Sequence, residues 1–191
     1  MARLVLDTAR FVEERALSVG ENIAKANPVP SNIRAGISTL EEKSLGAIHK
    51  SGTKPIQGVL QYAEQPPGRG LYFVHDWASQ LSILQGHAAA GAQVVLYQYG
   101  GGGLPAVSLL EPSFGGVAPT LWCSGNPLTR ERCAGSLDFS SASVLEGEET
   151  LEEAGERLLD MIVEVASVAL TRAETVNFTS PTTTYFLDPV F

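Results

Sequence analysis

The sequence predicts an α/β fold, with a mainly parallel sheet flanked by helices. Three apolar runs rich in β-branched or aromatic residues occupy residues 56–62, 70–74 and 92–99. Nearly uninterrupted runs of this length suit strands that are buried on both faces, as in a parallel sheet. Segments with helical spacing of apolar residues alternate with these runs, which is typical of this fold class.

Helix signals surround the first runs. Residues 5–16 place apolar side chains at helical spacing with charges between them. Either Ser38 or Thr39 can begin a helix that runs to about residue 49, with a glutamate three positions later completing a capping box. Residues 79–90 predict a crossover helix between the second and third strands, and therefore a right-handed βαβ unit.

The second half of the chain continues the alternation. Residues 117–123 are a further strand candidate, and Asn126 can cap the next helix with Pro127 at its first position. Thr150 and Glu153 form a capping box that opens the clearest helix. We expect one face of that helix to hold Leu151, Leu158, Ile162, Val165 and Ala169.

Length and composition limit the classes of protein. The 191 residues suit a single domain over 1–191, with a Thr-rich divergent tail at 173–191. The net charge of -8 argues against nucleic-acid binding and disfavours an anionic membrane surface. No apolar run reaches about 18 residues, and the charged N-terminus does not resemble a signal peptide. We therefore expect a cytoplasmic protein that does not bind membranes, with its two cysteines reduced.

Several short features are candidates for chemistry, each beside a structural alternative. The glycines at 100–103 follow a predicted strand, but a flexible turn is favoured over a ligand cradle. Gly125-Asn126-Pro127 suits an anion site or a plain helix cap about equally. His75 and Asp76 follow a probable central strand, on the side where ligands usually bind.

The remaining candidates have simpler explanations. His49 lies near a helix end and His87 lies in an Ala-rich helix, so both are expected to be structural. Cys123 and Cys133 are expected to be packed thiols. The helix segment 41–44 offers carboxylates and amines, but such a segment is usually a solvated face.

An ordered series of motifs favours a functional role for some of these residues over the structural alternative. Residues 27–58 read NPVPSNIRAGISTLEEKSLGAIHKSGTKPIQG. Later motifs are Gly70-Leu71-Tyr72, Ala89 to Val95, Gly125-Asn126-Pro127 and Leu145-Glu146-Gly147. Over about residues 20–172 the series resembles the C-terminal part of the altronate/galactarate dehydratase family, bacterial enzymes that remove water from sugar acids.

The resemblance implies a metal-assisted hydro-lyase, with Fe²⁺ as the usual ion. Its substrate would be a small hydroxy acid such as altronate or galactarate, and its product a 2-keto-3-deoxy acid. The resemblance also implies a Rossmann-like variant, of which this chain would form the C-terminal half. We therefore expect a homodimer or a partner chain that supplies the other half.

The resemblance also implies roles for particular residues. Lys43 or Lys50 would serve as base or carboxylate anchor, and Glu42 as ligand or acid. His75 and Asp76 are secondary candidates for the metal. The residues expected to bind substrate are Asn27, Asn32, Ser38, Ser44 and Asn126.

Departures from the family pattern leave alternatives open. The family tends to have Asp-Thr-Pro-Gly where this chain has His75-Asp76-Trp77-Ala78, and an arginine where this chain has Gly101. An insertion then extends to about Gly116. The alternative to an enzyme is a degenerate member that binds a carboxylate ligand or a partner protein without turnover. The ordered motifs disfavour an unrelated small α/β binding module.

Overall fold

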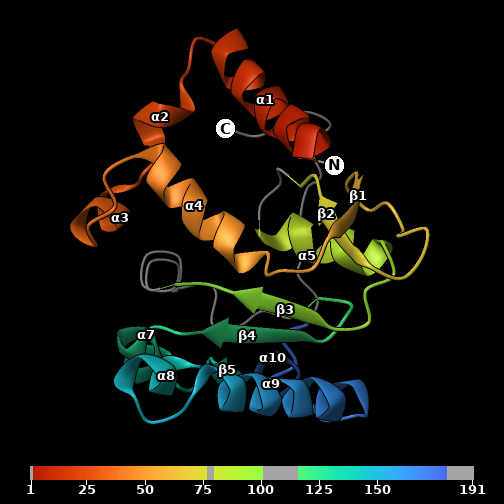
Figure 1. Ribbon diagram of the computed structural model, residues 1–191. Coiled ribbons are helices and arrows are strands. Elements are labelled where there is room, and N and C mark those ends of the chain that lie inside the picture. The colour runs from red at the N-terminus through yellow and green to blue at the C-terminus, as the bar shows by residue number, and fades with distance from the viewer. Residues whose placement is uncertain (1, 77–79, 101–115, 180–191) are drawn as a thin grey trace. The chain divides into compact units, whose positions relative to one another are not determined.

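Two parallel sheets organise the chain in the computed structural model, which describes residues 2–76, 80–100 and 116–179 (Figure 1). The chain divides into two compact units, and each unit holds one sheet. The first contains the described residues 2–76 and the second the described residues 80–179. The predicted α/β fold with parallel strands and flanking helices is confirmed, and the single domain over 1–191 stays a prediction.

The first unit consists of four helices and two strands among its described residues: α1 (Ala2–Ser18), α2 (Ile23–Ala26), α3 (Pro30–Arg34), α4 (Leu40–Lys50), β1 (Ile56–Leu60) and β2 (Leu71–Val74). β1 and β2 pair in parallel, with Val59 opposite Phe73. Residues 61–70 connect them without a helix, and this connection is shorter than the usual crossover between parallel strands.

This unit buries little apolar surface. Of its described apolar side chains, Ala16 and Leu60 are the buried ones. α4 buries none of its side chains, and Leu45 and Ile48 are 56% and 65% exposed. Large exposed apolar side chains on one helix face are typical of surfaces that contact another protein segment.

The prediction that the first strands are buried on both faces is wrong. β2 alternates between exposed and half-buried residues, with Leu71 and Phe73 exposed. Successive side chains of a strand point to opposite faces. A continuous apolar run therefore places apolar side chains on both faces, but each face is buried only where another element packs on it.

The second unit has the order β3-β4-β5 in its sheet, and all its described pairs are parallel. Its elements are α5 (Gln80–Ala89), β3 (Val95–Gln98), β4 (Thr120–Ser124), α7 (Pro127–Cys133), β5 (Phe139–Ser140), α8 (Ala142–Glu146), α9 (Leu151–Ala166) and α10 (Arg172–Thr175). Figure 1 shows α5 on one side of this sheet and α9 on the other.

The central strand β4 decides the packing of this unit. All five of its residues are buried, as predicted for a strand with both faces covered. Leu121 and Cys123 pack with Val165 of α9, while Trp122 packs with Leu84 of α5. Successive side chains of β4 therefore point to opposite faces of the sheet and belong to two separate apolar clusters. On β3 the prediction is wrong, because only its first residue is buried.

The predicted βαβ unit around α5 is also wrong. Within the described residues, β2 pairs with β1 and β3 pairs with β4, so the strands on either side of α5 belong to different sheets. The strand–helix–strand arrangement occurs instead at β4, α7 and β5. Apolar runs locate strands, but they do not specify which strand pairs with which.

The predicted helix starts are confirmed. Thr39, Asn126 and Thr150 are the N-cap residues of α4, α7 and α9, and each side chain accepts a hydrogen bond from the helix backbone. Pro127 occupies the first turn of α7, and Glu153 completes a capping box.

The predicted apolar face of α9 is confirmed in its centre and wrong at its ends. Leu158 and Ile162 pack against the buried cluster that includes Val165. Leu151, in the first turn, is 71% exposed, and Ala169 lies beyond the end of the helix. Helical spacing identifies a face, but the extent of the sheet beneath it decides which turns are covered.

Candidate functional site

The start of α4 holds two of the predicted site residues. Thr39 Oγ1 accepts the backbone N–H of Glu42 at 3.1 Å. Oε2 of Glu42 in turn accepts the backbone N–H and the hydroxyl of Ser38, each at 2.8 Å. The structure thus brings Glu42 and Ser38 together, but Glu42 bonds to the residue before the N-cap and not to the backbone of Thr39, so the predicted capping box is only half formed.

These bonds affect the charge of Glu42. The backbone N–H of Ser38, followed by its hydroxyl, holds the pKa of the Glu42 carboxyl below its usual value. The carboxylate is exposed and stays ionised. Both predicted roles of Glu42, ligand and acid, stay predictions.

Lys43 has a partner on another element. Its Nζ donates a hydrogen bond to Oδ1 of Asn27 at 2.8 Å in a partly buried setting. Asn27 ends α2, and its backbone N–H donates to the carbonyl of Ile23 at 3.0 Å. The contact spans 16 residues and joins the Asn-Pro motif to the Glu-Glu-Lys-Ser motif.

The other predicted residues of this region make local contacts. Asn32 Oδ1 accepts the backbone N–H of Val29 at 3.2 Å, and Ser44 Oγ donates to the carbonyl of Leu40 at 2.8 Å. Lys50 is exposed at the end of α4. Among the described residues, no hydrogen bond joins these three side chains to the Lys43–Asn27 pair.

His75 and Asp76 directly follow β2, as predicted. The backbone N–H of His75 donates to the carbonyl of Leu60 at 2.7 Å, and its ring meets Phe11 of α1 edge-on with centroids 5.3 Å apart. Nε2 of His75 is buried and has no hydrogen-bond partner within the described ranges of the chain. His75 also borders a cavity of about 520 Å³, together with Asp7 and Thr8 of α1.

The described residues do not fit a metal centre. Nowhere in the described ranges do three or more His, Cys, Asp or Glu side chains converge. A non-haem Fe²⁺ site typically needs at least two histidines and a carboxylate. His75 and Asp76 alone do not supply such a set, and the predicted metal ligands stay a prediction.

Asn126 and Gly100 lie at the carboxyl ends of the second sheet. Asn126 Oδ1 accepts the backbone N–H of Thr129 at 3.2 Å, which is the plain helix cap considered above. Thr129 Oγ1 donates to the carbonyl of Gly100 at 3.3 Å. The rest of the glycine run, together with Trp77 and Ala78, lies outside the described residues.

A half-buried carboxylate in this unit is not marked by any sequence signal. Asp138 Oδ2 accepts the backbone N–H of Trp122 at 2.8 Å, and its Oδ1 accepts that of Arg172 at 2.7 Å. Burial raises the pKa of Asp138, against the opposing effect of these two bonds. No spacing signal marks Asp138, because its partners lie 16 and 34 residues away.

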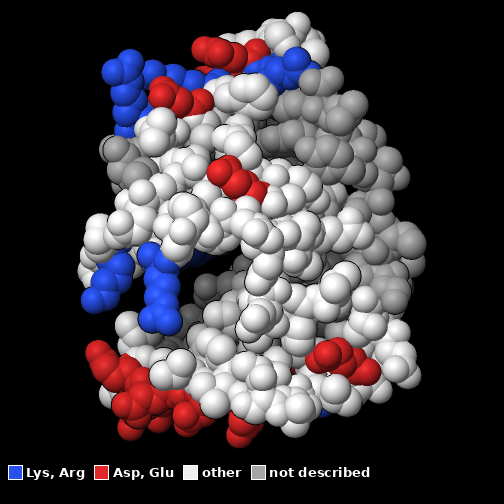
Figure 2. Space-filling model, turned by 90° about the vertical axis from the view of Figure 1, so that its right-hand side faces the viewer, with Lys and Arg blue, Asp and Glu red and all other residues white. Residues whose placement is uncertain are grey.

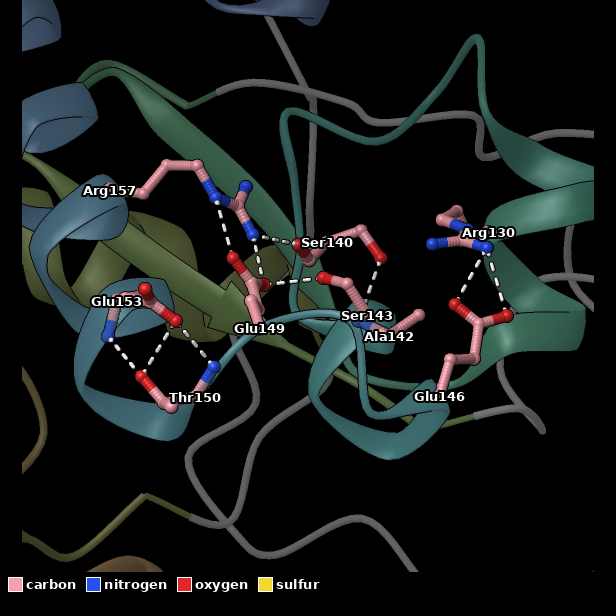
Figure 3. A network of polar contacts seen from close by, with 9 residues as sticks. All are labelled: Arg130, Ser140, Ala142, Ser143, Glu146, Glu149, Thr150, Glu153 and Arg157. Carbon is pink, nitrogen blue, oxygen red and sulfur yellow. Dashed lines mark hydrogen bonds and ion pairs between the residues drawn. The ribbon is translucent and has the colours of Figure 1, made fainter.

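A second missed cluster surrounds Arg157 of α9 (Figure 3). Its Nη2 donates to Oε1 of Glu149 at 2.6 Å and to the carbonyl of Ser140 at 2.9 Å. Its guanidinium also lies over the ring of Phe139, 4.5 Å from the centroid. Glu149 additionally accepts the hydroxyl of Ser143. The arginine therefore ties the end of β5 to the loop before α9.

Cys123 lies at the same end of the sheet. Burial, followed by the charge of Asp138, raises the pKa of the Cys123 thiol to about 12. A thiol with this pKa is protonated at neutral pH and is a poor nucleophile. The geometry supports the interpretation of Cys123 as a packed thiol.

The charged side chains of one face of the molecule can be seen in Figure 2. On the face shown in Figure 2, acidic and basic side chains lie next to one another at the top, and much of the remaining area is uncharged. None of the helices in the described ranges is both long enough and apolar enough to cross a membrane.

Comparison with known proteins identifies relatives over most of the chain. Altronate dehydratase of Bacillus subtilis is 33% identical over 152 residues, which cover 80% of this chain and 29% of the relative. Galactarate dehydratase (L-threo-forming) of Escherichia coli is 31% identical over 154 residues, covering 79% and 27%. The beta subunit of (2R)-sulfolactate sulfo-lyase from Chromohalobacter salexigens is 31% identical over 154 residues, covering 80% and 38%.

The matched part of this chain thus spans between 27% and 38% of the length of these three relatives. By their names, two of them are dehydratases and the third is a sulfo-lyase. The family described as D-galactarate/altronate dehydratase, C-terminal, matches residues 1–186. Because that match covers nearly the whole sequence, the chain belongs to the D-galactarate/altronate dehydratase family and represents its C-terminal part.

Proposed function

We propose that this chain carries part of the active site of a hydro-lyase that removes water from a sugar acid such as altronate or galactarate. The observation that carries the proposal is the hydrogen bond between Lys43 Nζ and Asn27 Oδ1. It holds a cation in a partly buried position and joins the two most characteristic motifs of the family resemblance. Cytoplasm stays the predicted compartment.

Lys43 suits the role of carboxylate anchor. An ammonium group has three donors, and Asn27 accepts one of them. The remaining donors can bind a substrate carboxylate, and partial burial strengthens such charge-assisted hydrogen bonds. Asn27 positions the ammonium group, because its own backbone is held at the end of α2.

The reaction is a β-elimination. A base removes the proton on the carbon next to the carboxylate, and a general acid donates a proton to the hydroxyl of the following carbon, which leaves as water. The resulting enol becomes a 2-keto-3-deoxy acid. Lys43 would hold the carboxylate on which negative charge develops. The other predicted site residues, Glu42 and Lys50, keep secondary roles in this proposal.

Metal assistance by Fe²⁺ is part of the proposal only as an expectation from the family. Since the described residues do not assemble a ligand set, no step is assigned to the ion. Measurement of iron in the purified protein by elemental analysis tests this expectation directly.

We also propose that further polypeptide completes the site, either from the same chain or from a partner. Two observations support this. The exposed Leu45 and Ile48 on α4 flank the motif that contains Lys43. In addition, each of the relatives extends well beyond the matched region, and one is named as a subunit.

The test is an anaerobic assay with Fe²⁺ on altronate and galactarate, with (2R)-sulfolactate for comparison. It uses the chain alone and together with any protein encoded beside it, and it measures formation of a 2-keto acid. Lys43→Met should lower kcat/KM by about 10- to 150-fold, which corresponds to loss of a charged hydrogen bond of about 1.5–3 kcal/mol. Lys54→Met, at an exposed lysine, should leave it unchanged.

Unchanged kcat/KM in both Lys43→Met and Asn27→Ala would refute the assigned anchor. A second candidate function is ligand binding without turnover, which Gly101 in place of the expected arginine favours. Binding of a sugar acid that depends on Lys43, with no product in any setting, would support that candidate.

A further inference from the structure

We propose that the second unit contains a binding pocket for a short, uncharged, hydroxylated carbon chain. The pocket lies between the carboxyl ends of β3, β4 and β5 and the N-terminal half of α9. The proposal concerns binding alone, so it does not depend on turnover at the Lys43–Asn27 pair.

The position of the pocket follows from the parallel sheet. Gln98 ends β3, Ser124 ends β4 and Ser141 follows β5, and all three line a cavity of about 150 Å³. The strand ends are level, because Gln98 pairs with Cys123 and Ser124 with Ser140. Ligands of open parallel sheets bind at the carboxyl ends of the strands.

Small residues of α9 keep the cavity open. Ala154 and Gly155 form its opposite wall. Open space surrounds the position that a Cβ at residue 155 would occupy, so no close contact requires a glycine there. Glycine is less stable than alanine in a helix interior, and Gly155 is exposed at the wall of the cavity.

The lining groups indicate the chemistry of the ligand. Ser124 is 1% exposed and its Oγ accepts the backbone N–H of Asn126 at 3.3 Å, which leaves its own O–H to donate. The side chain of Ser141 makes no capping hydrogen bond, and the amide of Gln98 can both donate and accept. Among the residues that the structure describes, no charged side chain lines the cavity, and these groups match hydroxyls better than a carboxylate or an ammonium group.

The remaining walls are apolar. Cys123, Phe139 and Leu158 face the same cavity and suit the C–H surface of a carbon chain. The volume is below the roughly 300–1,000 Å³ of pockets for drug-sized ligands. The occupant is therefore a short chain or the short end of a longer molecule.

The polar rim is held in place by surrounding contacts. A Cβ at Gly125 would lie 3.1 Å from Ser141 Oγ, a tight contact, so a glycine at residue 125 favours the close approach of the two strand ends. Arg157 binds the carbonyl of Ser140 at 2.9 Å and lies over Phe139, as Figure 3 shows for the bond to Ser140. Because these contacts fix the polar rim before a ligand arrives, the rim loses less conformational entropy on binding.

The experiment is a ¹H–¹⁵N NMR titration of the full chain with erythritol, and with butyrate as a charged chain of similar length. Erythritol should cause saturable shifts of the Gln98 side-chain amide and of the backbone amides of Gly125 and Ser141. Gly155→Leu, which adds a bulky side chain at the cavity wall, should raise the apparent Kd at least tenfold. Gly46→Leu is the matched control, since Gly46 is a glycine of α4 that also faces open space.

The absence of saturable shifts, an unchanged Kd in Gly155→Leu, or equally tight binding of butyrate would overturn the proposal. If Gly155→Leu does not fold, Gln98→Ala tests the same site at an exposed side chain, with Gln93→Ala as its control. Loss of binding in Gln98→Ala but not in Gln93→Ala is the expected result, and equal binding in both is the refuting one.

Discussion

Replacement of Asp138 tests whether one half-buried carboxylate contributes to the stability of the second unit. Its two oxygens accept backbone N–H groups of Trp122 in β4 and of Arg172 in α10, at 2.8 and 2.7 Å. Asp138→Ala removes both acceptors. Trp122 is buried and Arg172 is exposed, so the loss at Trp122 should dominate.

The magnitude follows from these two bonds. A buried donor left without its acceptor costs about 1–3 kcal/mol, and the exposed bond adds roughly 1 kcal/mol. We expect Asp138→Ala to lower the free energy of unfolding by about 3 kcal/mol, or Tm by about 6–12 °C for a chain of this size. Asp138→Asn keeps one acceptor oxygen, so its effect should be about 1–2 kcal/mol.

The assay is urea unfolding followed by circular dichroism and by tryptophan fluorescence, and coincident transitions would justify a two-state analysis. Asp160→Ala is the control, since Asp160 is exposed on α9, and its effect should stay within about 0.5 kcal/mol. A change of less than about 0.5 kcal/mol in Asp138→Ala would refute the reasoning.

The pH dependence of the same variant has a defined sign. Burial raises the pKa of Asp138 in the folded state, so the folded state binds a proton more readily than the unfolded state. The stabilisation linked to this group is full below the unfolded pKa and is lost as pH rises through the raised folded pKa. The stability difference between the wild type and Asp138→Asn should therefore widen as pH falls from 7 toward 4.

Three further predictions concern the same unit. Thr150→Ala removes the cap of α9 and should lower the free energy of unfolding by about 1 kcal/mol in the urea assay. The hydrogen bonds of Arg157, followed by that of the neighbouring serine, lower the pKa of Glu149. Their stabilisation is present above the unfolded pKa and lost as pH falls through the folded pKa, so Arg157→Met should reduce the loss of Tm on acidification. At pH 8, iodoacetamide should modify Cys133, which is partly exposed, and leave Cys123 intact, because burial raises the pKa of Cys123 to about 12.

Each of these expectations has a contradicting result. Unchanged stability in the cap variant would show that the observed bond contributes nothing. If Tm of Arg157→Met falls on acidification as steeply as Tm of the wild type, the pKa of Glu149 is not linked to stability through Arg157. Mass spectrometry that finds both thiols modified at similar rates in the folded protein would exclude the packed environment of the first cysteine.

The two units differ in how far their own residues account for their stability. The second unit buries two apolar clusters on opposite sides of β4, whereas the first unit leaves α4 without a buried side chain. Burial of apolar surface is the main favourable contribution to folding. We therefore expect the first unit to depend more on additional polypeptide, in line with the proposed completion of the site.

Local sequence determined the elements and their ends. The caps at Thr39, Asn126 and Thr150 were predictable because a short side chain bonds to a backbone N–H two or three residues away. Of the described strands, β1 to β4 were predictable from apolar runs, whereas the two-residue β5 was not predicted. The central face of α9 was predictable from helical spacing. The family was also evident in the sequence, because its motifs are short and ordered.

Only the tertiary structure decided which strands pair, which faces stay exposed and which polar groups meet. The partners of Lys43 and Asp138 lie 16 or more residues away, and no periodicity encodes such a distance. β3 pairs with β4, and the apolar pattern of β3 does not specify this partner strand. Local propensity acts over a few residues, whereas burial and hydrogen bonding between distant segments are settled only when the whole chain packs.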